Sequence, residues 1–486
     1  MKRLSIVMFL VFTGVAFLAG PASAEMGMGK VTPVTTDVGI QFFGSLKTFP
    51  HFVSNMDFND EDTNFDALLD ENGWIDNDEV TVRNEFRLGM KGGGESWNFL
   101  AILESDFAFD QGNADRGSRA GEVPDLGMRG EDFGVEKLKF NYDFSSHGLP
   151  ATLETGWDTT WADLETGGLF YGDDHPYIRL FGNMDDIKWE LLALIIRDAA
   201  ITTGNGDDQD WQAYIAKATL PAGPLKVVPF YGYSDNQARE ANVHYLGIEA
   251  YGKMGNLTPK AEFVYALGDK DNFTATGGDA DISAYGGFAA IEASLGDMFN
   301  PYVGGYLISG DDDANDDDIE AFNPITNIAR YAGPFGIENA FIYRGSSLLG
   351  SPVYSNAFER LGGVNGYGGL SNAASANSPG MYTLGLGTKG GMNSWSYKTQ
   401  FQYFWLAETG ALEDLAGTDT LPNAADSIDE DMGWEFDLQI TYHFNKHFSL
   451  GNVISIFDPG DGIEDLRGPD FDEMAIVDTI EMKWTF

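Results

Sequence analysis

Trp434-Glu-Phe-Asp-Leu-Gln-Ile-Thr-Tyr-His-Phe444 is the stretch that decides the fold class. Large apolar residues occupy every even position, and polar or charged residues occupy every odd position. Successive side chains of a β-strand point to opposite faces, so a period of two predicts a strand with one apolar and one polar face. Segments 97–109, 395–405 and 479–486 repeat the pattern. The chain is therefore predicted to be all-β.

Two all-β architectures produce such alternation, a soluble sandwich and a transmembrane barrel. Strands of a sandwich run for about 5–6 residues, whereas a tilted strand needs about 9–11 residues to cross a bilayer. Many alternating runs in this sequence are of the longer kind, and their apolar faces carry aromatic residues at both ends, as in Trp434 with Phe444 and Trp395 with Trp405. Aromatic girdles at both interfaces are typical of membrane barrels. The pattern favours the barrel.

The same criterion predicts eighteen strands. They cover residues 37–46, 80–91, 97–109, 135–144, 150–158, 177–183, 187–198, 211–220, 225–234, 243–253, 256–267, 282–294, 299–309, 381–389, 395–407, 433–444, 448–457 and 475–486. The runs between 177 and 253 alternate less cleanly than the others.

Short and long connections follow one another in regular phase. Turns such as Asn445–His447 alternate with long connections at 47–79, 110–134, 310–380, 408–432 and 458–474. Outer-membrane barrels have short periplasmic turns and long extracellular loops. The phase predicts an even strand number and both termini on the periplasmic side.

Composition excludes several classes. The 486 residues include no cysteine, and 29 Lys+Arg against 75 Asp+Glu give a net charge of −46. Such a charge repels nucleic acid, which is bound by clustered basic residues. The missing cysteines exclude disulfide frameworks, thiolate metal sites and catalytic thiols. Aromatic residues at 13 % are too many for a disordered acidic chain.

The first residues have the composition of a leader. Lys2 and Arg3 precede an apolar run at 4–18, and small residues at 21–24 form an A-x-A cleavage pattern. This order is typical of a secretory signal peptide. We expect a signal peptide at 1–24, a short periplasmic segment at 25–36 and the barrel at 37–486.

Acidic residues concentrate in the long connections, where five segments together hold 40 of the 75. The simpler interpretation is a solvated, charged outer rim. A second interpretation is that these loops hold divalent cations such as Ca²⁺, which prefer several carboxylate oxygens. The acidic run at 311–318 supplies the candidate ligands Asp311, Asp313, Asp316 and Asp318.

Tyr306-Leu-Ile-Ser309-Gly310-Asp311-Asp-Asp, followed by Phe322-Asn323-Pro324, resembles the strand-end S-G-D … F-(D/N)-P signature of the alginate-export porins. The resemblance implies a single-chain outer-membrane barrel of eighteen strands and a passage for an anionic polysaccharide. The arginine- and lysine-rich constriction of that family has no residue-by-residue counterpart in this sequence.

Residues on the polar face of each strand are expected to line the lumen. The predicted pore-lining set is Arg83, Glu85, Arg87, Glu104, Asp106, Lys137, Lys139, Lys260, Glu262, Lys398, Glu435, Asp437, Glu481 and Lys483. Cross-strand pairing that stabilises the wall is the simpler role for any one pair, and charge selection is the functional one. Connection 310–380 is long enough to fold inward as a constriction, with Arg330, Arg344 and Arg360 as its cations.

The sequence predicts a porin that passes hydrophilic solutes or ions by diffusion through a bacterial outer membrane. An exporter of an anionic polysaccharide and a barrel sheath around an electron-carrying cytochrome are the alternatives. No enzyme activity is expected, because the six histidines are scattered and His443 has no serine in register. Outer-membrane lipid and small solutes are the expected partners. A homotrimer and an unidentified periplasmic partner both stay open.

Overall fold

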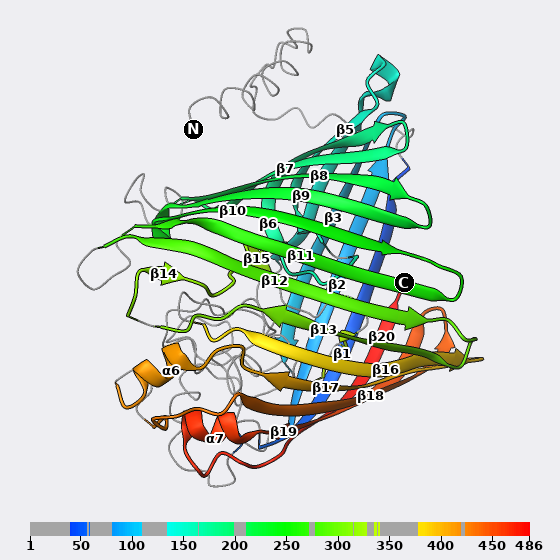
Figure 1. Cartoon of the computed structure of the whole chain (residues 1–486). Helices are drawn as coiled ribbons and strands as arrows, with labels where there is room; N and C mark the ends of the chain where they lie inside the picture. Colours follow the sequence, from blue (N-terminus) through cyan, green and yellow to red (C-terminus); the bar gives the residue numbers. More distant parts are fainter. Residues whose placement is uncertain are drawn as a thin grey trace, which may run out of the picture. The chain divides into compact units, whose positions relative to one another are not determined.

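Eighteen long strands, each of 9 to 15 residues, make up most of the chain that the structure describes (Figure 1). The structure is a computed structural model, and it describes residues 39–55, 58, 80–108, 134–163, 165–198, 210–271, 278–313, 315–327, 335–337, 339–340, 378–418 and 423–486. The predicted segments 1–24 and 25–36 lie outside these residues.

The long strands bear out the period-two analysis in number and order. They are β1 (Gln41–Ser54), β2 (Val80–Gly93), β3 (Trp97–Ala108), β4 (Gly134–Asp143), β5 (Ala151–Trp161), β6 (Tyr171–Met184), β7 (Ile187–Arg197), β8 (Trp211–Ala222), β9 (Leu225–Asn236), β10 (Ala241–Gly252), β11 (Leu257–Lys270), β12 (Ala280–Ala293), β13 (Asn300–Ile308), β16 (Met381–Met392), β17 (Trp395–Trp405), β18 (Asp431–Asn445), β19 (Phe448–Pro459) and β20 (Ala475–Thr485).

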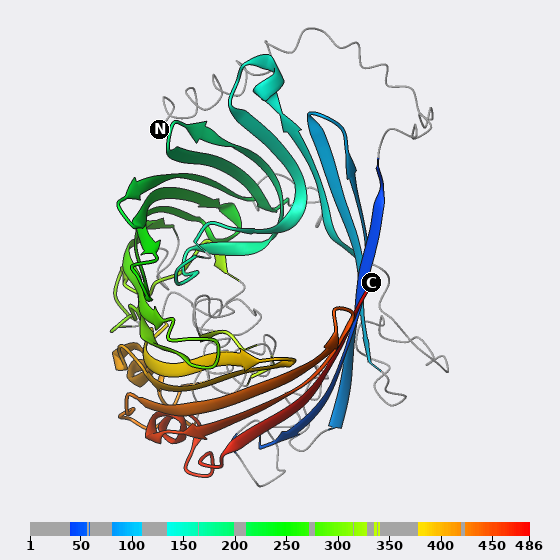
Figure 2. The same ribbon diagram turned by 90° about the vertical axis from the view of Figure 1, so that its right-hand side faces the viewer.

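Each long strand pairs antiparallel with its neighbours in the chain, and β1 also pairs with β20, so the sheet closes on itself (Figure 2). Leu46 lies opposite Trp484 in the closing pair. Closure removes the unpaired edges that a sheet cannot expose to lipid. The fold is an eighteen-stranded antiparallel β-barrel.

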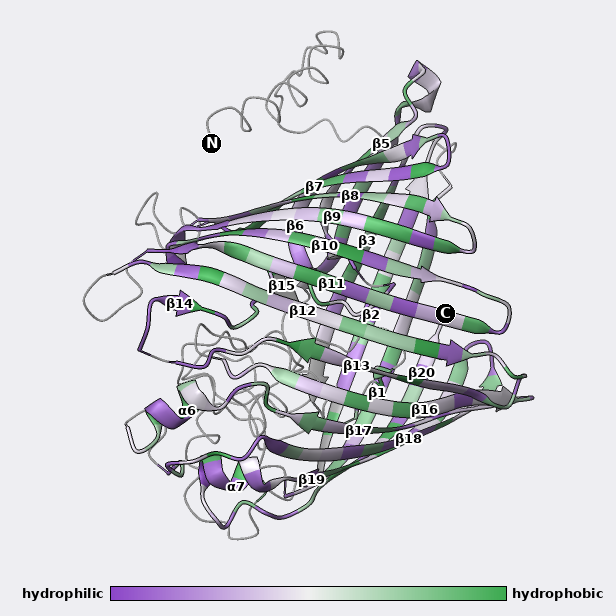
Figure 3. Cartoon of the chain, in the orientation of Figure 1, coloured by the Kyte–Doolittle hydropathy of each residue, from purple (hydrophilic) through white to green (hydrophobic). Residues whose placement is uncertain are grey.

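Exposure alternates along the strands as the sequence predicts. On β18, Glu435 and Asp437 are fully buried, whereas Phe436 is 37 % exposed and Ile440 is 40 % exposed. Hydrophilic and hydrophobic residues alternate in the same way along other strands (Figure 3). The apolar side therefore faces outward and the charged side faces the interior.

Two predicted strand boundaries are wrong. β1 covers Gln41–Ser54 rather than 37–46, so the first long connection begins at 55. Pro50 lies inside β1, where the pairing with β20 is interrupted between Thr48 and His51, so its missing N–H removes no ladder hydrogen bond there. β6 begins at Tyr171 rather than 177, because its first residues pair with β5, and the side chains of Tyr171 and His175 are buried.

Short elements lie among the long connections. They are β14 (Asp318–Ile319), β15 (Thr326–Asn327), α6 (Gly410–Leu415) and α7 (Asp461–Arg467). β14 pairs parallel with β12, and β15 pairs parallel with β6. Two single-turn helices, η2 (Phe144–His147) and η3 (Gln237–Arg239), lie in other connections. Among the described residues, no helix has the length and hydropathy of a membrane span.

The interior holds a hydrophobic core as well as charges. Phe170, from the connection between β5 and β6, stacks on Phe230 of β9 at 4.8 Å and lies 5.3 Å from the ring of Tyr245. Leu192 and Leu194 of β7 are buried in the same cluster. Strands in this part of the barrel are apolar on both faces because folded segments cover their inner side. This explains the weak alternation between 177 and 253.

Candidate functional site

The described residues of the connection between β5 and β6, 162–163 and 165–170, fold into the barrel, and we call them the inner loop. Asp163 shapes it, because its carboxylate accepts the backbone N–H groups of Phe170 and Tyr171, and its carbonyl accepts those of Thr166 and Gly168. Gly168 has a φ of 65°, a left-handed conformation that glycine adopts without strain. The loop is therefore a compact turn built around one side chain.

The inner loop reaches strands that are distant in the barrel order. Lys217 of β8 donates from Nζ to the carbonyl of Ala162 at 2.8 Å, and the hydroxyl of Tyr306 on β13 donates to the carbonyl of Gly167 at 3.2 Å. Thr166 lies against Glu249 of β10 and Glu262 of β11. These contacts hold the loop across the lumen, where it narrows the passage.

Close approach requires a glycine on the facing wall. A Cβ atom at Gly232 of β9 would collide with the ring of Phe170. Gly385 of β16 makes room in the same way for Phe335, which belongs to the long connection after β13. Both aromatic rings are buried. The wall is thus shaped to receive the inward-folding segments.

Two pieces of connection 310–380 contact the inner wall. The hydroxyl of Tyr245 donates to the carbonyl of Asn323 at 3.0 Å, and the backbone N–H of Ile325 donates to that of Phe170 at 3.1 Å. Further along, Gln400 of β17 donates to the carbonyl of Phe335 at 2.7 Å. Arg330, Arg344 and Arg360, the predicted cations of this connection, lie outside the described residues.

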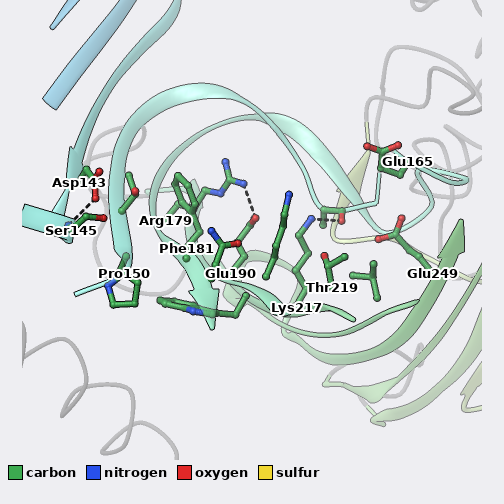
Figure 4. Close-up of a pocket in the computed structure, with 18 of the residues that line it drawn as sticks. Asp143, Ser145, Pro150, Glu165, Arg179, Phe181, Glu190, Lys217, Thr219 and Glu249 are labelled. Carbon is green, nitrogen blue, oxygen red and sulfur yellow. Dashed lines mark hydrogen bonds and ion pairs between the residues drawn. The ribbon is translucent and has the colours of Figure 1, made fainter. Parts of the chain in front are cut away.

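A cavity of about 690 Å³ lies beside the inner loop (Figure 4). Its lining combines aromatic groups, such as Phe181 and Tyr251, with charged groups of both signs. Arg179 points toward Glu190 and pairs with it at 2.6 Å, while Lys217, Glu165 and Glu249 line the side next to the loop. A polar cavity of this size has room for a small hydrophilic solute.

The predicted wall residues on β2 to β4 form a network of ion pairs. Glu85 pairs with Lys47 at 2.9 Å and with Arg87 at 3.0 Å. Arg87 also pairs with Glu104 at 3.1 Å and with Glu136 at 3.1 Å. For Arg83 and Asp106 the structure describes the backbone in β2 and β3, but their side chains lie outside the described part.

A second network continues around the wall. Asp158 of β5 pairs with both Lys137 and Lys139 of β4 at 2.6 Å. Arg179 of β6 bridges Glu154 at 3.3 Å and Glu190 at 2.6 Å. Asp158, Glu154 and Arg179 lie on predicted strands but do not belong to the predicted pore-lining set. Charges of both signs therefore follow one another from β4 to β7.

The remaining predicted residues lie on β11, β17, β18 and β20. Lys260 approaches Glu292 at 3.5 Å, and Glu292 also pairs with Lys389 at 2.6 Å. Lys398 donates to the carbonyl of Gly336 rather than to a wall acid. Lys483 pairs with Glu481 at 3.3 Å.

Glu435 and Asp437 of β18 are bridged by one hydroxyl. Ser455 of β19 contacts Glu435 Oε1 at 2.9 Å and lies close to Asp437 Oδ1. Asp437 also accepts a hydrogen bond of 2.7 Å from Gln400. These two acids are therefore tied into the wall.

Among the residues that the structure describes, no group of three or more His, Asp or Glu side chains is placed to hold a metal ion, and calcium binding by the acidic run at 311–318 stays a prediction. Asp311, Asp313 and Asp316 use carboxylate oxygens to accept backbone N–H groups of their own loop, including those of Glu320 and Asp318. Burial raises the pKa of Asp311 to about 7.

Sequence reasoning also missed a serine–histidine contact. Ser396 Oγ of β17 lies 3.1 Å from His443 Nε2 of β18, near the short turns. The residue directly opposite Ser396 is Thr441, and His443 lies diagonally, two positions further along β18. A search for residues directly opposite each other therefore misses the contact. A catalytic triad also needs a group that orients the base, and the contacts described for His443 include no carboxylate.

The inner loop is the main feature that the sequence did not reveal. Its residues Asp163, Thr166 and Phe170 lie in a short connection with no unusual composition. The available signal was indirect: the apolar run at 189–196 left both faces of β7 apolar, which requires protein on the inner side.

No family model matches the chain, and no curated protein matches it. Among solved structures, OccK8 (OprE) of Pseudomonas aeruginosa is similar over 92 % of this chain and 98 % of that chain, at 11 % identity and a TM-score of 0.50. OccK5 (OpdH) of the same organism covers the same shares at 12 % identity and a TM-score of 0.49. OccAB3 of Acinetobacter baumannii covers 92 % of this chain at 10 % identity and a TM-score of 0.49. The likeness to OccK8 (OprE) extends over nearly the whole of both chains, and it is a likeness of fold.

Proposed function

We propose that this protein is an outer-membrane channel through which small hydrophilic solutes or ions diffuse. One observation carries the proposal: charged side chains are buried inside a closed barrel whose outer face is apolar. Such a distribution suits a protein with lipid outside and water inside.

In this proposal the inner loop and the segments at 318–327, 335–337 and 339–340 form the constriction of the channel. The mixed charges beside the loop, among them Arg179, Glu190 and Lys217, would offer donors and acceptors to a passing solute. Fixed charges along a narrow wall select solutes by charge, and the acidic rim raises the local cation concentration.

The two alternatives have less support. An exporter of an anionic polysaccharide, as the alginate-export resemblance implies, would need a track of basic groups available to the polymer. The described cations of the wall, such as Arg87, Lys137 and Lys139, are instead paired with acids. A sheath around a cytochrome would need an empty interior, whereas inward-folded segments occupy part of this one.

Recording in planar bilayers tests the proposal. Folded protein should give discrete conductance steps, and the reversal potential in a KCl gradient gives the charge preference. A small cation preference is expected because the rim is acidic. Absence of discrete steps from folded protein would overturn the channel, and selective block by alginate would favour the exporter.

A further inference from the structure

Thr166 of the inner loop lies between two buried acids of the far wall. Its Oγ1 is 2.8 Å from Glu249 Oε1 and 2.9 Å from Glu262 Oε2. Thr166 is fully buried, and Glu249 and Glu262 are 2 % and 4 % exposed. Glu262 Oε2 also accepts the backbone N–H of Gly167 at 2.8 Å. These two carboxyl groups thus attach the loop to the wall, beside the contacts that Lys217 and Tyr306 make with its carbonyl groups.

The number of protons in this arrangement is constrained by the chemistry of the groups. A hydroxyl has one proton to donate, and an ionised carboxylate can only accept. Thr166 can therefore satisfy one of the two acids, and the other holds its short contact only if it carries a proton itself. At least one proton must be bound for both hydrogen bonds to exist.

Asp163 of the loop adds a third acid to this site. Its carboxyl group and that of Glu262 act on each other, and two neighbouring acids repel when both are ionised. Glu262 Oε1 is buried, and no N–H or hydroxyl of the described residues reaches it. Burial also raises the pKa of Asp163, in the loop itself. A buried acid pair of this kind keeps a proton more strongly than an exposed acid.

Other charged and titratable groups face the cluster from the elements around it. Lys217 of β8 is the cation that acts on Asp163 and Glu249. Glu165 of the loop, Tyr251 of β10 and Tyr306 of β13 complete the surroundings. One amine thus faces three buried carboxyl groups and Glu165, so full ionisation would leave several negative charges unbalanced.

We propose that Asp163, Glu249 and Glu262, together with Thr166, form a proton-binding site that fastens the inner loop across the lumen. When the site loses its protons, the carboxylates repel one another, the hydrogen bonds to Thr166 and Gly167 are lost, and the loop leaves the wall. Widening of the passage by loop release rests on the proposed channel function. Release of the loop from the wall does not depend on that function.

A thiol reporter tests release without any conductance. The chain contains no cysteine, so Leu169→Cys places a single thiol on the loop at a position that is 2 % exposed. Its rate of labelling by a methanethiosulfonate reagent is divided by that of Leu149→Cys, an exposed position beside a short turn. The ratio should rise by about tenfold or more between about pH 5.5 and about pH 9. A constant ratio would overturn the proposal.

Glu262→Gln supplies the matched variant. Its amide can accept from Thr166 and Gly167 while donating to Asp163, as the protonated acid does. In the Leu169→Cys background it should reduce the rise of the labelling ratio with pH, because one of the three acids can no longer ionise. Glu249→Gln is the second variant if Glu262→Gln does not fold, and Glu190→Gln, in the cavity wall, should leave the pH response intact. A pH response unchanged by Glu262→Gln would contradict the proposal.

Conductance and metal give the remaining outcomes. Channel conductance should rise with pH in the wild type and rise less in Glu262→Gln. If thiol labelling depends on pH but the protein shows no conductance, the proton site is supported and the channel function is contradicted. Protection of the thiol by Ca²⁺ at constant pH, reversed by a chelator, would replace the proton with a metal ion and overturn the proposal.

Discussion

Lys398 Nζ of β17 donates a hydrogen bond of 2.7 Å to the carbonyl of Gly336, which lies 62 positions earlier in the chain. The lysine belongs to the wall and the glycine to the long connection after β13. Lys398 also lies 5.8 Å from the centre of the Tyr302 ring. Lys398, which the sequence predicted to line the pore, therefore binds the inward-folded segment at 335–337.

Replacing Lys398 with methionine should loosen this segment. Hydrogen bonds to charged groups contribute about 1.5–3 kcal/mol, so the population with residues 335–337 undocked should rise by roughly 10- to 100-fold. Single-channel records of Lys398→Met should show more frequent high-conductance events. Lys389→Met is the control, because Lys389 pairs with Glu292 instead. Equal current noise in the two variants would refute the docking role.

Gly385→Ala tests the slot that receives Phe335. The added Cβ would collide with that ring and with Gln402, and overpacking of this kind costs about 1–3 kcal/mol. The midpoint of urea unfolding, followed by heat-modified mobility on a gel, should fall. Gly287→Ala should behave as wild type, since its nearest neighbours are at 3.8 Å. A normal midpoint for Gly385→Ala would mean that the ring is not docked in the slot.

Arg179→Gln should shift selectivity toward cations. The change leaves Glu154 and Glu190, which Arg179 bridges, without their cation. One unit charge within a few ångströms of a permeating ion changes its energy by about 1 kcal/mol in water, so the cation-to-anion permeability ratio should rise by about two- to fivefold. Reversal potentials in a salt gradient measure it. Lys253→Gln, at a short turn, makes the same charge change away from the pair and should have little effect.

Asp158→Asn should shift the same ratio in the opposite direction. The aspartate holds Lys137 and Lys139, and its loss leaves two ammonium groups on the wall without a shared partner. A ratio lowered by about twofold is expected. Asp297→Asn, at another short turn, is the matched control. A shift toward cations would show that these lysines do not face the permeating ions.

The loop after β13 should loosen as pH rises. Burial raises the pKa of Asp311 to about 7, above the ordinary value of about 3.9. A raised folded-state pKa means that stability is fully present at pH below about 4 and declines as pH rises through about 7. Amide exchange at 309–327, corrected for the intrinsic pH effect, should therefore be faster at high pH. Asp311→Asn, which stays neutral, should remove this dependence, and Asp317→Asn should retain it.

The wall of the barrel was predictable at the level of single strands. Trp434–Phe444 alternates without interruption, and β18 covers it with Glu435 and Asp437 inside and Phe436 outside. β1 and β6 were misjudged at one end each, because Pro50 and the polar start at Tyr171 look like loop sequence. The local sequence pattern indicates which face of a strand is apolar. It does not indicate where the pairing of that strand with its neighbour ends.

The constriction was not predictable in the same way. Asp163, Thr166 and Phe170 occupy a short connection, and nothing in their sequence indicates that they meet Glu262 or Phe230. Connection 310–380 was expected inside, and the wall contacts of its described residues come from Phe335, Gly336 and Asn323, none of which the sequence singled out.

The sequence by itself determined the architecture. Alternation with a period of two over long runs gives each strand one apolar face for lipid and one polar face for the interior, and only a closed sheet satisfies every backbone hydrogen-bonding group in a bilayer. Tertiary structure alone decided what fills the lumen. Loop docking depends on contacts between residues far apart in the chain, such as Thr166 with Glu262. It also decided the state of the charges, because a carboxyl group that is exposed on an isolated strand becomes a buried proton site when a loop covers it.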